Sequence, residues 1–392
     1  MAPPIHALTR ARQNHAMNDN NQTELTEKTA TPQADELPTT TQADELPATA
    51  QANELPATAQ ADELPATAQA SQYYKSVDIA KFIAAITVVG IHTEIFCQFR
   101  LLDMGFGVIS RLAVPLFFLI SGFFFFSKPV TLPRVLHVVK RLLILYVIYS
   151  AFFTILRLIL NDPLSINDLY VFLFQGGYRH LWFLVALMIG IVLTASLQAI
   201  MKKWAVLATA TIIYILGLLL GTYYPIASAL PPIAALHELL NIDQFTVRNG
   251  FFFGFPFVAV GMALAQIKRM PSFKFSLSLT LLSLGGLFTE TWIAVKLLHT
   301  TSTILWLSCI PATFFLMQCL LHIKKIHFDT RFARKTATFI YLIHPTFILL
   351  LQSSMSQGLL MFAIVFAASL ILAVLVAKGS AHKRLKFLNY LI

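Results

Sequence analysis

The chain contains ten apolar stretches that are each long enough to cross a lipid bilayer. A transmembrane helix needs about 20 mainly apolar residues, because the hydrocarbon core is about 30 Å thick. The composition agrees, with 57% hydrophobic residues, 33 phenylalanines and only 12% charged residues, which excludes an ordinary soluble protein. We therefore predict an all-α membrane protein built as a bundle of about ten transmembrane helices. The expected spans are residues 77–97, 107–126, 142–160, 181–200, 204–222, 250–267, 274–293, 303–322, 337–354 and 358–377.

Lysine and arginine are distributed unevenly among the predicted loops. Cytoplasmic loops of membrane proteins are enriched in these residues. If residue 76 faces the cytoplasm, the loops and tail on that side hold eighteen of them. The opposite loops hold only Arg100, Arg179, Arg248 and Lys296. We therefore expect both termini in the cytoplasm. The positive loops are explained by anionic lipid, and no aromatic-interleaved basic patch indicates a nucleic-acid partner.

The region before the first span has a different character. Residues 33–68 are four copies of a nine-residue unit, QADELPTTT, QADELPATA, QANELPATA and QADELPATA. Recurring proline and acidic residues with few large apolar groups cannot offset the entropy lost on ordering. We predict that residues 1–72 form a disordered cytoplasmic tail without a cleaved signal peptide, and that residues 73–392 form the transmembrane domain.

Lys81 and His92 stand on one face of the first predicted span. Eleven positions at 100° each come to about 20° beyond three full turns, and the two residues are about 16 Å apart along the helix. A charge at the centre of a bilayer costs about 3 kcal/mol or more to insert. The alternative to a functional pair is a lysine that reaches the headgroups and a histidine bonded to a neighbouring helix.

Five segments occur in an order that resembles a known family of membrane enzymes. They are DIAKFIAAITVVGIH, RLAVPLFFLISGFFFF, HLWFLVAL, RNGFFFGFPFVAVGMAL and IYLIHPTF. Together they resemble the acyltransferase 3 family of integral membrane O-acyltransferases. The resemblance implies a ten-helix enzyme of the bacterial inner (cytoplasmic) membrane. Such an enzyme moves an acyl group, usually acetyl from acetyl-CoA, to a hydroxyl of a cell-envelope glycan or lipid-linked sugar.

The family pattern of a basic residue and a histidine with ten residues between them carries over to Lys81 and His92. The family usually has arginine at the first place, and lysine lacks the bidentate fork that suits phosphates. Lys140 and Arg141 supply charge in the second cytoplasmic stretch, where the family has Arg-x-x-Arg. The resemblance thus implies that Lys81, Lys140 and Arg141 bind the acetyl-CoA donor.

Chemistry alone also makes His92 the best candidate for catalysis. Acyl transfer to a hydroxyl needs a base near neutral pH, and histidine has an ordinary pKa of about 6.5. His92 could act as this base, or it could take the acyl group itself before passing it on. Tyr341 and His344 lie one turn apart near the expected cytoplasmic end of the ninth span. They could line the donor site, and Pro345 would kink the helix there.

Four residues at the expected outer surface are candidates for binding the acceptor. His180 and Trp182 open the fourth span, where an aromatic ring could stack on a sugar. Arg248 and Asn249 open the sixth span. The alternatives are an ordinary aromatic belt for Trp182 and an interface anchor for Arg248.

Glu94 and Glu290 are acidic residues inside predicted spans. Glu94 and Arg111 lie at matching depths on neighbouring antiparallel spans, so we predict an ion pair that supports the His92 site. Glu290 stands alone in the seventh span, where a packed hydrogen bond is the better explanation. The spacing of Cys97, Cys309 and Cys319 indicates neither a disulfide framework nor a metal site.

A second resemblance leaves a transport function open. The string RNGFFF before a span of small residues also resembles the membrane domain of membrane-bound serine racemases associated with vancomycin resistance, for which substrate uptake is expected. Inverted repeats with paired broken helices would favour a transporter, and the sequence contains no clear pair. The sequence does not determine the oligomeric state.

Overall fold

The computed structural model describes residues 74–161, 178, 180–242, 246–300, 304–380 and 382. The chain divides into two units, residues 1–62 and 63–392, and the described residues all belong to the second unit. The prediction for the tail, residues 1–72, therefore lies outside the described residues. The helices run in the order α1 (Lys75–His92), α2 (Arg100–Ser110), α3 (Ala113–Phe126), α4 (Leu132–Ile159), α6 (Trp182–Ile200), α7 (Lys203–Leu220), α8 (Tyr224–Ala227), α9 (Pro231–Leu239), the π-helix η4 (Gly250–Gly254), α10 (Phe255–Ala265), α11 (Phe273–Lys296), α12 (Cys309–His322), α13 (Arg331–Leu351) and α14 (Leu359–Gly379).

Every regular element in the described part of the chain is a helix, as predicted. Six helical segments are long and apolar enough to cross a membrane by length and composition. They are the α2–α3 pair, α4, α6, α7, α11 and α14. The η4–α10 segment and α12 are apolar but shorter. Because each expected span has a helical counterpart while six meet the criteria for crossing, the count of ten stays a prediction.

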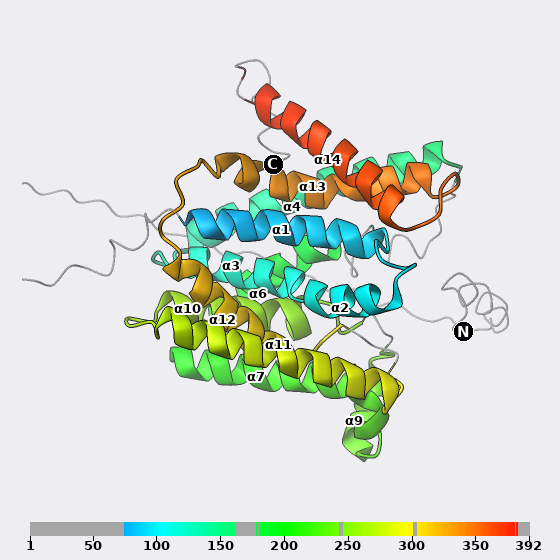
Figure 1. Cartoon of the computed structure of the whole chain (residues 1–392). Helices are drawn as coiled ribbons and strands as arrows, with labels where there is room; N and C mark the ends of the chain where they lie inside the picture. The colour runs from blue at the N-terminus through cyan, green and yellow to red at the C-terminus, as the bar shows by residue number, and fades with distance from the viewer. Residues whose placement is uncertain are drawn as a thin grey trace, which may run out of the picture. The chain divides into compact units, whose positions relative to one another are not determined.

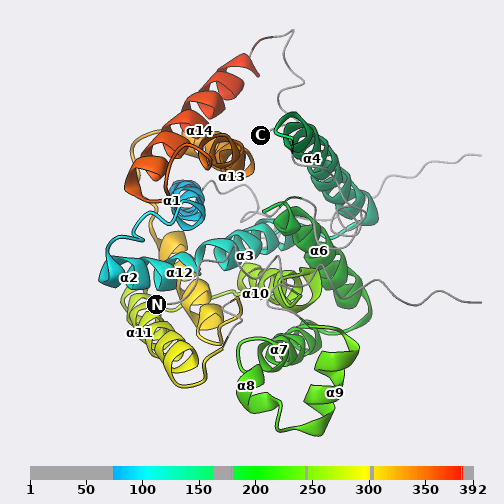
Figure 2. The same cartoon turned by 90° about the vertical axis from the view of Figure 1, so that its right-hand side faces the viewer.

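The bundle is centred on α3 and α10, which pack closely together. Figure 2 shows these two helices between α6 and α12, with α1, α13 and α14 on one side and α7 on the other. Glycines permit the close approach: a Cβ at Gly122 would overlap the Val258 carbonyl oxygen, and one at Gly261 would overlap the Leu119 carbonyl oxygen. Small residues at such crossings let transmembrane helices approach closely.

The helices α1 and α13 run side by side in the same direction (Figure 1). Near their N-terminal ends, the Thr330 hydroxyl donates to the Asp78 carboxylate at 3.0 Å, and Lys75 Nζ donates to the Ile326 carbonyl at 2.8 Å. Beyond their C-terminal ends, the Gly358 N–H donates to the Thr93 carbonyl at 2.9 Å. Residues at similar positions along these two helices are therefore at similar depths.

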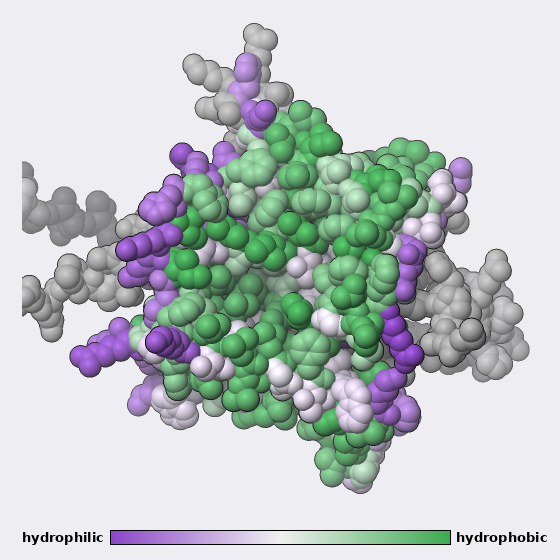
Figure 3. All heavy atoms as spheres, viewed as in Figure 1, coloured by the Kyte–Doolittle hydropathy of each residue, from purple (hydrophilic) through white to green (hydrophobic). Residues whose placement is uncertain are grey.

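The surface of the described residues in Figure 3 has hydrophilic groups at the two sides of the view and a broad hydrophobic band between them. This pattern is typical of a protein whose helices are surrounded by lipid, since hydrocarbon cannot satisfy polar groups. The helices run across this band in the matching view of Figure 1. The protein is a multi-pass membrane protein.

The hydrogen bonds of Glu290 confirm the prediction made for this residue. Its carboxylate accepts from the backbone N–H groups of Leu307 at 2.6 Å and Ser308 at 2.8 Å, just before α12 begins. The Tyr223 hydroxyl also donates to it. These bonds satisfy a carboxylate that would otherwise be costly at this depth, and they fix the start of α12 against α11.

Candidate functional site

Three histidines from different parts of the chain form a cluster at the C-terminal end of α1. The ring centres of His92 and His344 are 5.3 Å apart, and those of His344 and His180 are 5.5 Å apart. His92 is the last residue of α1, His344 lies on α13, and His180 lies two residues before the start of α6. His180 and His344 are fully buried, whereas His92 is half-buried. The fold thus brings a predicted catalytic residue, a predicted donor ligand and a predicted acceptor ligand together.

Hydrogen bonds fix the orientation of the two buried rings. Nδ1 of His344 donates to the carbonyl oxygens of Tyr341 at 2.8 Å and Ile340 at 3.2 Å, and Nε2 of His180 donates to the Leu342 carbonyl at 3.0 Å. Only a protonated nitrogen can bond a carbonyl, so each ring carries a hydrogen at that position. The other nitrogens, Nε2 of His344 and Nδ1 of His180, are buried and have no hydrogen-bond partner among the described residues. In the neutral rings, these two nitrogens are acceptors.

Pro345 accounts for part of this arrangement. It lies inside α13 directly after His344, and a proline in a helix removes one backbone hydrogen bond and crowds the carbonyl four residues earlier. That carbonyl belongs to Tyr341, and it accepts from the His344 ring instead. The sequence His-Pro therefore supplies both the ring and the carbonyl that orients it.

The structure corrects the predicted depth of Tyr341 and His344. The helix α13 begins at Arg331, six residues before the expected start at 337, so both residues lie in its central and later part rather than at the cytoplasmic end. Tyr341 donates from its hydroxyl to the His180 carbonyl at 2.8 Å. Its ring is 5.7 Å from His180 and 6.3 Å from His344. Tyr341 is therefore a member of the histidine cluster, and its role as a donor ligand stays a prediction.

Trp182 and Arg248 contact each other beside this cluster. The Arg248 guanidinium carbon is 5.1 Å from the centre of the Trp182 ring, and Phe253 stacks on the same ring system at 5.7 Å. Trp182 is only 8% exposed. The expectation that Trp182 offers a face for stacking on a sugar is wrong for this arrangement, because protein groups already cover the ring. Arg248 is close enough to act electrostatically on Tyr341, which links this pair to the histidines.

Asn249 has a structural task that the sequence did not reveal. Its side-chain oxygen accepts from the backbone N–H groups of Phe251 and Phe252, both at 2.8 Å, and its amide nitrogen donates to the Thr246 carbonyl at 2.8 Å. It caps the start of η4, where unpaired N–H groups need an acceptor. The asparagine in RNGFFFG thus caps the helix, and the contact of its neighbour Arg248 with an acceptor stays a prediction.

A second, basic cluster lies around Lys81 in the N-terminal half of α1. The charged groups close enough to act on Lys81 are Asp78, Arg334 and Arg141, from α1, α13 and α4. Because α1 is continuous, the rise of about 16 Å between Lys81 and His92 holds. Lys140, the remaining predicted donor ligand, is exposed on α4.

Sequence reasoning missed Arg334 as a member of the basic cluster. The apolar pattern places Arg334 in a cytoplasmic loop, because the ninth span is expected to begin at residue 337. The overlooked signal is the run RFARK, which continues without a helix-breaking residue into the apolar stretch that follows. Arg334 in this first turn is seven positions before Tyr341, or 20° short of two full turns, so the two residues share a face of α13.

The predicted ion pair between Glu94 and Arg111 is wrong. The helix α1 ends at His92, five residues before the expected end of the span, and Glu94 lies exposed in the following turn with φ of 48°. With the Gln357 amide nitrogen turned toward it, Glu94 accepts at 2.7 and 2.9 Å. Arg111, at the break between α2 and α3, places its guanidinium carbon 4.8 Å from the centre of the Trp306 ring. No ion pair joins Glu94 and Arg111 within the described residues.

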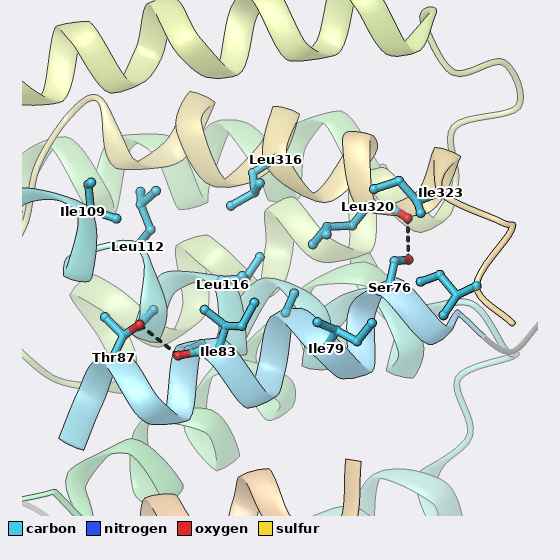
Figure 4. A pocket seen from close by; sticks show the side chains of 14 residues that line it. Ser76, Ile79, Ile83, Thr87, Ile109, Leu112, Leu116, Leu316, Leu320 and Ile323 are labelled. Atoms are coloured by element: carbon cyan, nitrogen blue, oxygen red, sulfur yellow. Dashed lines mark hydrogen bonds between the residues drawn. The ribbon is translucent and has the colours of Figure 1, made fainter. Parts of the chain in front are cut away.

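An apolar groove of about 330 Å³ lies between α1, the α2–α3 pair and α12 (Figure 4). Ser76 and Thr87 contribute hydroxyls to its lining, and these donate to the carbonyls of Leu320 and Ile83. On α1 the groove is lined by Ile79 and Ile83, and Lys81 is two positions, or 200°, from each. Ile79 and Ile83 thus point away from the face of α1 that carries Lys81 and His92. The lining of the groove suits a hydrocarbon chain.

Residues 74–378 match the profile of the acyltransferase 3 family, described as "Acyltransferase domain". An amino-acid racemase of Enterococcus faecalis is 27% identical over 327 residues, which are 76% of this chain and 45% of that protein. A serine/alanine racemase of Enterococcus gallinarum is 30% identical over 235 residues, which are 55% of this chain and 33% of that protein. The chain thus spans less than half the length of these curated relatives, and no solved structure matches.

Proposed function

Because the chain belongs to the acyltransferase 3 family, we propose that it is a membrane-embedded O-acyltransferase that moves an acetyl group from cytoplasmic acetyl-CoA to a hydroxyl of a cell-envelope glycan or lipid-linked sugar. The observation that carries this proposal is the placement of two clusters on one helix. The basic cluster surrounds Lys81 and the histidine cluster surrounds His92, on the same face of α1. An acetyl-CoA molecule carries its phosphates and its thioester at opposite ends. The basic cluster suits the phosphates, and the histidine cluster suits the thioester.

The basic cluster suits the phosphate end of the donor. Lys81, Arg141 and Arg334 come from three helices, and hydrogen bonds between charged groups and phosphate oxygens are about twice as strong as neutral ones. Asp78 is held by Thr330, so its carboxylate has a fixed direction. By the distribution of loop charges, this end of α1 faces the cytoplasm, where acetyl-CoA is available. The acyl end of an extended donor would then reach toward His92.

His92 is the residue that we assign to the chemical step. An imidazole nitrogen takes the proton from the acceptor hydroxyl while the oxygen attacks the thioester carbonyl carbon. The C–O bond forms, the C–S bond breaks, and the proton leaves with the thiolate as the free thiol. Transfer through an acyl-histidine remains the alternative route, in which His92 first forms the bond to the acyl carbon.

His344 and His180 complete the site around His92. Their acceptor nitrogens, with no partner among the described residues, can receive hydrogen bonds from the acceptor substrate or from the His92 ring. A site built to accept from hydroxyl groups rejects analogues that lack them, because buried polar groups would be left unpaired. Arg248 and Tyr341 extend this polar region toward the predicted outer side.

Mass spectrometry of envelope glycans tests this proposal directly. A deletion strain should lack an acetyl substitution, which wild-type protein restores and His92→Ala does not. His322→Ala is the control, since His322 is a partly buried histidine on another helix, α12, outside the cluster. Glycans that are unchanged in the deletion strain, or fully restored by His92→Ala, would refute the assignment.

Transport is the second candidate function, and the racemase relatives favour it. Their matched regions cover less than half of their own lengths, so this chain shares only a part of those proteins. If that part moves an amino acid across the membrane, then labelled L-serine should accumulate in vesicles that contain the purified protein. Acetyl transfer without uptake supports the enzyme, and uptake that persists in His92→Ala supports the transporter.

A further inference from the structure

A separate cavity of about 880 Å³ opens where α3, α6, α7 and α10 meet their loops. None of its lining residues belongs to α1, α4 or α13, the helices of the basic cluster. Its volume is in the range of small-molecule sites, about 300–1,000 Å³. Its lining residues are Phe126, Ser127, Lys128, Pro129, Val130, Ala195, Gln198, Ala199, Lys203, Ala265, Gln266, Ile267 and Lys268.

The charge of this cavity has one sign. Lys128 comes from the loop after α3, Lys203 from the first position of α7, and Lys268 from the loop after α10. The lining contains no carboxylate. Three ammonium groups around one cavity repel one another, and an anion between them would remove that repulsion.

Two further observations indicate a prepared site rather than scattered surface lysines. The side-chain oxygen of Gln198 is buried and has no hydrogen-bond partner among the described residues, although an unpaired buried acceptor is costly. The loop that carries Lys128 is held in place because Arg134 donates to the carbonyls of Lys128 at 3.0 Å and Pro129 at 2.9 Å. A ligand here therefore meets three exposed lysines, of which Lys128 stands on a fixed loop, and one acceptor without a partner among the described residues.

We propose that this cavity binds a phosphate ester that carries a hydroxyl group. The lysines contact the phosphate oxygens, and the Gln198 oxygen accepts from the hydroxyl. The same chemistry is present in the headgroup of phosphatidylglycerol and in soluble glycerol 3-phosphate. The site is independent of the acyl-transfer site, because no residue is shared between them.

The experiment compares two triple variants of the full chain in nanodiscs of phosphatidylcholine. The pocket variant is Lys128→Gln, Lys203→Gln and Lys268→Gln, and the control variant is Lys324→Gln, Lys325→Gln and Lys378→Gln. Both variants remove three exposed lysines from the same predicted side of the membrane. One arm adds phosphatidylglycerol to the nanodisc and the other adds glycerol 3-phosphate to the buffer. The readouts are the thermal unfolding midpoint and ligand retention in native mass spectrometry.

We expect at least one of the two probes to bind and stabilise the wild type and the control variant, with affinity at least tenfold weaker in the pocket variant. The arm that responds identifies the source. Gln198→Leu should weaken binding of the same probe several-fold while leaving the response to inorganic phosphate unchanged. Because this variant removes no charge, it tests the site even if the triple variant fails to insert into the membrane. Equal losses in the two triple variants, or no response of the wild type to either probe, would overturn the proposal.

Discussion

The imidazole rings of His92 and His344 lie 5.3 Å apart, centre to centre, where the last residue of α1 meets the later part of α13. This contact exists because α1 and α13 run in the same direction and are tied together at both ends, by the bond from Thr330 to Asp78 and the bond from Gly358 to Thr93. It joins the one residue that the sequence assigned to catalysis with a residue that it assigned to donor binding.

His344→Gln should lower kcat for acetyl transfer about 10- to 100-fold and leave the donor KM nearly unchanged. Glutamine keeps a polar side chain of similar reach but cannot keep the ring orientation fixed by the Tyr341 and Ile340 carbonyls. Steady-state kinetics with labelled acetyl-CoA measure both parameters. His322→Gln, on α12, is the control and should retain wild-type kcat. A His344→Gln enzyme with normal kcat would remove His344 from the site.

Arg334→Ala and Lys81→Ala should each raise the donor KM about tenfold with a smaller change in kcat. One charge-assisted hydrogen bond contributes about 1.5–3 kcal/mol, and 1.4 kcal/mol is a factor of ten. Lys81→Arg should be tolerated, because arginine keeps the charge and adds the fork that suits phosphate. Lys335→Ala, next to Arg334 and exposed, is the control. Normal donor KM in Arg334→Ala would separate Arg334 from donor binding.

Gly261→Ala should destabilise the protein by about 1–3 kcal/mol, the usual cost of overpacking. The added Cβ would overlap the Leu119 carbonyl and lie 2.7 Å from the Phe123 nitrogen, so α10 must move away from α3. Gly285→Ala makes the same chemical change on α11, where nothing lies within 4 Å. It should be neutral or slightly stabilising, since alanine favours helix more than glycine. Thermal melting in one detergent compares them, and equal midpoints would contradict the close α3–α10 packing.

A reporter fused after residue 325 should read cytoplasmic, and one inserted near residue 230 should read external. The reason is the excess of Lys and Arg in the loops on one side of the predicted spans. The readout is a pair of reporter proteins that are active on opposite sides of the membrane, namely alkaline phosphatase and a fluorescent protein. A reversed result at either position would place the basic cluster of Lys81 away from the cytoplasmic donor.

The sequence alone determined the all-α class, the approximate positions of the helices and the family. These properties depend on local pattern: runs of apolar residues, and short motifs whose order survives without knowledge of contacts. The alignment of Lys81 with His92 also follows from helix geometry, because eleven residues of continuous helix fix both angle and rise. Glu290 was predictable for a similar reason, since a lone carboxylate at that depth must be satisfied locally.

Only the tertiary structure decided which residues meet across helices. The apolar pattern places helix ends to within several residues, and an early end of α1 removed Glu94 from the helix, whereas an early start of α13 moved His344 to the level of His92. Spacing carries no information on which helices pack together, so the contacts among His92, His344 and His180, and the nearness of Arg334 to Lys81, could not be foreseen. In a bundle whose helices are apolar on nearly all faces, partner choice depends on close packing at small residues such as Gly122 and Gly261 and on a few hydrogen bonds.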